Sequence, residues 1–128
     1  MPAISAMIDV IAGTAAIGLA TARPTVDRAH ATDALAIARR LHRRGGSSFY
    51  AVTGLRLWVQ AAHVLGDRTT SRKLLARAQA AAHERGGNVD RLAIRAFAGD
   101  AIDPGPLGSA LTWSTGGMID GEHGWQLR

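Results

Sequence analysis

Glycine recurs at regular intervals through the middle of this chain, and that spacing restricts the fold more than any other feature. Four stretches of helical periodicity each end on glycine, at Gly45-Gly46, Gly66, Gly86-Gly87 and Gly99. Glycine commonly ends helices because it adopts left-handed backbone angles without steric cost. Residues that favour helix N-caps follow three of these stops, namely Ser47-Ser48, Asp67 and Asn88. The pattern predicts helices at about residues 32–44, 48–65, 69–85 and 89–98, arranged as two stacked antiparallel hairpins.

The second of these helices is predicted to lie at the centre. One stripe at helical spacing is formed by Val52, Leu55, Trp58, Ala62 and Leu65, and further apolar residues widen it beyond the face of a surface helix. The third helix has a narrower face of small residues beside a basic face. That basic face consists of Arg68, Arg72, Lys73 and Arg77.

Residues 3–22 form a nearly uncharged apolar run whose length also suits a signal peptide or a membrane helix. No Lys or Arg precedes the run, Asp9 lies inside it, and much of it is Ala and Gly, which contribute little to insertion. We therefore expect a buried N-terminal helix within residues 1–22, and a membrane location is the less favoured alternative. Pro24 then ends the helical pattern.

The last 28 residues differ in composition from the rest, and we assign residues 1–100 to a helical hairpin domain and 101–128 to a Pro/Gly-rich tail. Residues 109–115 alternate as a short strand would, before a turn at Gly116-Gly117. The expected fold is thus all-α, with about five helices and an irregular or short β tail. Trp113 and Trp125 are expected to cover the open end of the helical stack, or to anchor a tail that orders on a partner.

An internal repeat supports the hairpin arrangement. A shift of 41 residues places residues 41–46 on residues 82–87, and such a period is typical of two-helix solenoid units. Between Leu55 and Ala78 the chain resembles a degenerate tetratricopeptide repeat, as found in the helical regions of maltose-regulator-type bacterial transcriptional regulators. The residues that carry the resemblance are Trp58, Ala62, Leu65-Gly66-Asp67, Ser71, Leu75 and Ala78. This resemblance implies a bacterial protein–protein interaction scaffold and no catalytic residues.

The leading functional hypothesis is a helical interaction module, with a regulatory role and self-association both open. The groove between the second and third helices and the basic face would form its contact surface. The residues assigned to partner binding are Trp58, Arg68, Arg72, Lys73, Arg77, Trp113 and Trp125. The chain contains no cysteine, which excludes disulfides and thiolate chemistry and agrees with a cytoplasmic location.

Two alternatives come from other classes of protein. The net charge of +5 attracts phosphates as well as acidic partners. A small nucleic-acid-binding protein would use a second basic cluster, Arg39, Arg40, Arg43 and Arg44, as its phosphate contacts. A small enzyme or ligand-binding protein would use Asp120, Glu122 and His123, the most compact group of titratable residues. No catalytic motif, metal site or cofactor site is expected.

Overall fold

The computed structural model describes residues 2–46 and 48–127, so Met1, Ser47 and Arg128 lie outside the described chain. Within it the protein is all-helical, with six α-helices and two short 3₁₀ turns. The helices are α1 (Pro2–Thr21), α2 (Arg28–Gly45), α3 (Phe49–Val64), α4 (Arg68–Arg85), α5 (Asn88–Phe97) and α6 (Gly108–Ser114), and the turns are η1 (Gly105–Leu107) and η2 (Gly121–His123).

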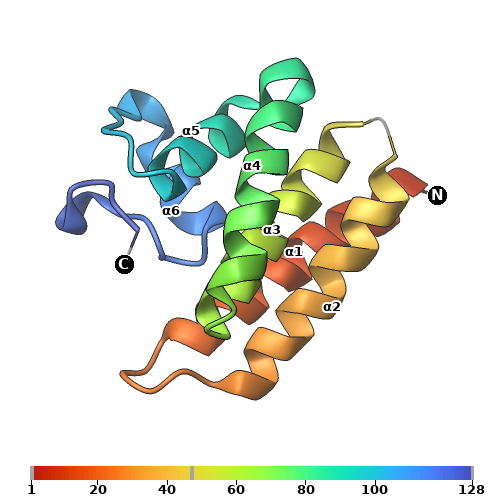
Figure 1. Ribbon diagram of the computed structural model, residues 1–128, viewed down its shortest axis with the longest axis horizontal. Coiled ribbons are helices and arrows are strands. Elements are labelled where there is room, and N and C mark those ends of the chain that lie inside the picture. The colour runs from red at the N-terminus through yellow and green to blue at the C-terminus, as the bar shows by residue number, and fades with distance from the viewer. Residues whose placement is uncertain (1, 47, 128) are drawn as a thin grey trace.

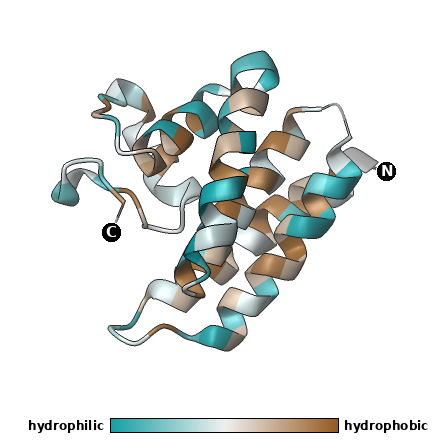
Figure 2. Cartoon of the chain, viewed as in Figure 1, coloured by the Kyte–Doolittle hydropathy of each residue, from teal (hydrophilic) through white to brown (hydrophobic). Residues whose placement is uncertain are grey.

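Each helix packs against the next one along the chain, and α3 also contacts α1 and α5. Figure 1 shows α1 and α2 on one side of α3, and α5 and α6 on the other. Eleven of the sixteen residues of α3 are buried. In Figure 2 hydrophobic residues concentrate on α3, whereas α4 in front of it is mainly hydrophilic or neutral. The predicted central position of this helix is therefore confirmed.

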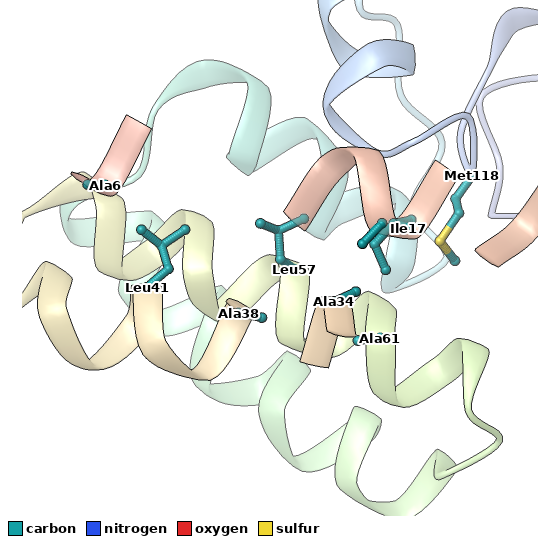
Figure 3. Close-up of a cluster of buried hydrophobic side chains, with 9 residues drawn as sticks. Ala6, Ile17, Ala34, Ala38, Leu41, Leu57, Ala61 and Met118 are labelled. Carbon is teal, nitrogen blue, oxygen red and sulfur yellow. The ribbon is translucent and has the colours of Figure 1, made fainter. Parts of the chain in front are cut away.

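Small residues allow the helices to approach closely. The cluster in Figure 3 joins Ala6 and Ile17 of α1, alanines of α2, and Leu57 and Ala61 of α3. At Gly54 of α3 an added Cβ would lie 2.8 Å from the Cα of His42, so the backbones of α2 and α3 are nearly in contact. Close packing of this kind depends on glycine at the point of approach.

The predicted helix ends agree with most of the observed caps. Ser48 and Asp67 accept hydrogen bonds from the N–H groups of Tyr50 and Thr70. Positive φ angles occur at Gly46, Gly66 and Gly99, as expected for helix stops. The predicted cap residue Ser47 lies outside the described residues.

Two helix starts differ from the predicted residues. α2 begins four residues before the predicted start, because Asp27 caps it by accepting from Ala29 N and His30 N. Gly86 has φ −75° rather than left-handed angles, and Gly87 instead of Asn88 is the N-cap of α5. Glycine at position 86 has a packing role, since a Cβ there would lie 2.8 Å from Ala82 Cα.

The strand predicted for residues 109–115 is also wrong, because this segment forms α6. Leu111 and Thr115 lie four residues apart and are both fully buried, so helical spacing overrides the apparent alternation. The described tail has one isolated antiparallel bridge, between Ile119 and Leu127. The turn at Gly116-Gly117 is confirmed by their φ angles of 61° and 82°.

The N-terminal helix is buried on one face only. Ile17 and Ala20 are fully buried, whereas Ile8 and Leu19 are 59% and 55% exposed. By length and composition alone, residues 4–21 would suffice to cross a membrane, a criterion that core helices and signal sequences also meet. The expectation of a buried helix is therefore met on one face of α1, and the opposite face is exposed.

Candidate functional site

The predicted partner-binding residues do not lie together. Arg68 and Arg72 line a groove beside α4, whereas Lys73 and Arg77 are exposed on the same helix outside that groove. Trp58 is half-buried on the side of α3 that faces α2, with the guanidinium carbon of Arg39 5.6 Å from its ring centroid. The expected single contact surface is thus not formed by these residues together.

The two tail tryptophans differ in their surroundings. Trp125 is half-buried and packs against the cluster of α5 and α6, where Gly108 leaves room for its ring. Trp113 is 58% exposed and lies beside α1, with Ile11 and Gly18 in the same cavity lining. Only Trp125 therefore covers the end of the helical stack as predicted.

The groove beside α4, named the basic groove below, is lined by both apolar and polar side chains. Ser71 fixes α4 to α3 beneath it, since its hydroxyl donates to Val59 O over 3.1 Å. The enclosed volume is about 180 Å³. The lining residues are Val59, Gln60, His63, Arg68, Ser71, Arg72, Leu75, Phe97, Met118 and Leu127.

A second cavity adjoins the basic groove and shares His63 and Met118 with it. It has a volume of about 320 Å³ and is bounded by Arg23 and the turn after α1. Arg23, Arg68 and Arg72 thus border the combined cleft, and none of the described residues that line either cavity is acidic. The cleft is therefore suited to a ligand that combines negative charge with apolar groups.

His63 lies where the two cavities meet. Burial lowers the pKa of His63, and the nearby charge of Arg68 lowers it further. The imidazole is therefore held toward its neutral form, with a capacity to take up a proton when a negative group approaches.

A buried polar network holds the tail against the groove. The carboxylate of Asp90 accepts from Arg56 Nε over 2.9 Å and from the Thr53 hydroxyl over 2.7 Å. Arg56 Nη1 also donates to Gln60 Oε1 over 2.8 Å and to the carbonyl oxygen of Ser114 over 2.7 Å. All of the side chains in this network are buried.

Gln60 carries the network to the wall of the groove. Its Nε2 donates to the carbonyl oxygen of Thr115 over 2.9 Å and to Met118 Sδ over 3.2 Å. Gln60 of α3 therefore helps to fix the position of the Met118 side chain. This network is not among the features predicted from the sequence. Its signal there is the recurrence of polar Thr53, Arg56 and Gln60 at helical spacing within an otherwise apolar helix.

The arginine cluster of α2 is divided by the fold. Arg40 pairs with the buried carboxylate of Asp9 over 2.7 Å, and Arg39 covers the ring of Trp58. Arg43 and Arg44 are exposed in the last turn of α2, where cations are favourably placed near the helix C-terminus.

The titratable residues of the tail form a local turn. Asp120 Oδ1 accepts from His123 N over 2.9 Å and lies 2.7 Å from His123 Nδ1, which makes Asp120 the cap of η2. Glu122 is exposed beside them. In the described part of the chain no three His, Asp or Glu side chains lie together as a metal site requires.

Comparison with known proteins adds no relative to this description. No protein family, curated protein or solved structure matches the chain.

Proposed function

We propose that this chain is a helical protein–protein interaction module that binds an acidic peptide segment in the basic groove. The observation that carries the proposal is the composition of the combined cleft. Arg23, Arg68 and Arg72 border it, Leu75 and Phe97 supply apolar surface, and none of its described lining residues is acidic. A peptide with alternating acidic and large apolar side chains matches that combination.

The arrangement of the helices supports an interaction role as well. The helices follow one another in space, and the next-but-one contacts of α3 with α1 and α5 suit a tetratricopeptide-like stack. In such a stack the surface between hairpins is open for a partner, and neither catalysis nor a cofactor is required.

Selection from a library of short random peptides on the immobilised protein tests the proposal. We expect the selected peptides to be rich in Asp and Glu next to large apolar residues. Their affinity should fall as salt is raised, because part of the attraction is between exposed charges.

Two charge-reversal variants of α4 locate the binding surface. Arg72→Glu should weaken binding of a selected peptide about tenfold or more, since an attractive contact becomes repulsive. Arg77→Glu changes the net charge equally, but Arg77 lies outside the groove, so binding should stay within about twofold. Equal losses in the two variants, or selected peptides without acidic residues, would refute the proposal.

A further inference from the structure

The outer face of α1 is a second surface of the molecule that calls for a partner. Residues of α1 that point inward include Asp9, Ala16 and Ile17, which are at most 7% exposed. The opposite face carries large apolar side chains that are all between 53% and 59% exposed, namely Ile4, Met7, Ile8, Ile11 and Leu19. A helix that is apolar all round is normally buried all round, so one face of α1 lacks its contact.

Trp113 extends this face beyond α1. Its side chain is 58% exposed, and it borders a cavity of about 440 Å³ together with Ile11, Ala15 and Gly18. The five α1 side chains and Trp113 are called the α1 face below.

The area of the α1 face is sufficient for a pair of copies. Six large side chains, each more than half exposed, leave on the order of 600 Å² of surface per copy. Two such faces supply about 1,200 Å² in total, which is the lower bound for specific protein–protein interfaces. Exposed apolar patches of this size typically mark interaction sites.

The distribution of charge favours a second copy as the occupant. Asp9 is the one charged residue in residues 2–21, and it is turned inward to Arg40. The α1 helices of two copies can therefore meet without opposing charges of their own, despite the net charge of +5. The charges that border this face on the α2 side, Asp33 and Arg40 beside Leu19, are of opposite sign. A membrane surface fits less well, because interfacial helices carry Lys or Arg on the face away from the lipid, and the inner face of α1 is packed against α2 and α3.

The spacing of large and small residues matches an antiparallel pairing. The stripe from Ile4 to Leu19 is centred next to Ile11. If a twofold axis passes there, Ile4 of one copy lies beside Leu19 of the other, and Ile8 of one copy lies on Ala15 of the other, next to the cavity of Trp113. Large side chains then face small ones, as close helix packing requires.

We propose that two copies of this chain pair through their α1 faces, with the two α1 helices antiparallel and Ile11 near the twofold axis. The residues of this contact do not line the basic groove.

Measurement of mass in solution tests the proposal. At a concentration on the order of 100 μM, where a contact of micromolar Kd is largely populated, the protein should have the mass of a dimer. Ile11→Asp and Ile11→Lys should each give a monomer, because each places two like charges at the axis. An equimolar mixture of the two variants should recover the dimer mass, since the opposite charges then meet.

Two controls separate the contact from the fold. Ala80→Asp introduces the same charge at an exposed position of α4 and should remain a dimer. Circular dichroism should show that both Ile11 variants keep their helix content, as expected for a side chain that is 53% exposed.

Several results would overturn the proposal: a monomeric wild-type protein at that concentration, a dimer that is insensitive to Ile11→Asp, or a mixture that stays monomeric. A monomer that binds vesicles of anionic phospholipid and loses this binding in Ile11→Asp would instead assign the α1 face to a membrane.

Discussion

Arg56 of α3 and Asp90 of α5 form an ion pair inside the protein, with 2.9 Å between Nε and Oδ1 and side chains that are 2% and 8% exposed. We predict that Asp90→Ala lowers the free energy of unfolding by about 3–5 kcal/mol, because it leaves the guanidinium of Arg56 buried without its counter-charge. Urea unfolding followed by circular dichroism measures this change.

The ion pair between Arg95 and Asp100 is the matched control. Both of these side chains are more than half exposed, and their atoms are 3.8 Å apart. Asp100→Ala should therefore change the free energy of unfolding by less than about 0.5 kcal/mol. Similar losses for Asp90→Ala and Asp100→Ala would show that the buried pair contributes no more to the free energy of unfolding than the exposed pair.

Protonation of His63 should destabilise the fold. Burial and Arg68 lower its pKa below the ordinary value of 6.5, so the unfolded chain takes up a proton at a higher pH than the folded chain. The stabilising contribution of the neutral imidazole is complete above the unfolded pKa and is lost as the pH falls toward the folded pKa.

Unfolding of the wild type and of His63→Gln at about pH 7.5 and pH 5.5 measures the effect of this pKa shift. The wild type should lose more stability over that interval than the variant, and equal losses would contradict the assignment. Arg68→Gln should raise the pKa of His63 in an NMR titration, since it removes one of the two causes of the shift.

Gly54 and Gly13 should differ in the stability cost of replacement by alanine. At Gly54 the new Cβ would meet the backbone of His42 and Leu41, which cannot move without separating α2 from α3. We predict a loss of about 2 kcal/mol or more for Gly54→Ala. At Gly13 the new Cβ would lie 3.2 Å from Leu57 Cδ1, at the end of a flexible side chain, and 3.3 Å from Ile37 Cγ2, so these side chains rather than backbone must shift slightly.

For Gly13→Ala the higher helix propensity of alanine, about 1 kcal/mol, offsets this mild crowding. Its free energy of unfolding should stay within about 1 kcal/mol of the wild type. Urea denaturation measures the free energy of unfolding of both variants. A Gly54→Ala protein as stable as the wild type would show that α2 and α3 leave room for a Cβ at position 54.

Thr14→Val should stabilise the protein. Thr14 is 4% exposed, and its hydroxyl has no hydrogen-bond partner within the described chain. Valine has nearly the same shape and removes the unpaired polar atom, so we expect a gain of about 1 kcal/mol in the free energy of unfolding. A lower melting temperature for Thr14→Val than for the wild type would indicate that the hydroxyl has a hydrogen-bond partner in solution.

The helical middle could be predicted because its determinants are local. Glycine stops, cap residues such as Asp67 and apolar periodicity act within a few residues of one another, and the four central helices follow from them. The helix at residues 108–114 was missed because a short segment with alternating residues fits both periods. Only its packing on α5 shows which spacing faces the core.

The basic residues of the basic groove could be predicted from the sequence, but its apolar residues could not. Arg68 and Arg72 were expected there from their places on the basic face of α4. The contributions of Phe97, Met118 and Leu127 come from segments that are distant in sequence and are brought together by the fold. The pairs of Arg56 with Asp90 and of Arg40 with Asp9 could not be predicted from the sequence either. The partners are 34 and 31 residues apart, so only the folded structure shows that they meet.

The α3 core binds the C-terminal segment through main-chain atoms, since Arg56 and Gln60 donate to the carbonyl oxygens of Ser114 and Thr115. A carbonyl oxygen is present whatever side chain occupies these positions, so amino-acid identity at 114 can drift during evolution without loss of that bond. Docking of this segment also closes loops of 58 and 55 residues, which places it late in folding. Truncation before residue 114 would remove one of the two acceptors of Arg56 Nη1 and both acceptors of Gln60 Nε2, so it should also destabilise the centre of the fold.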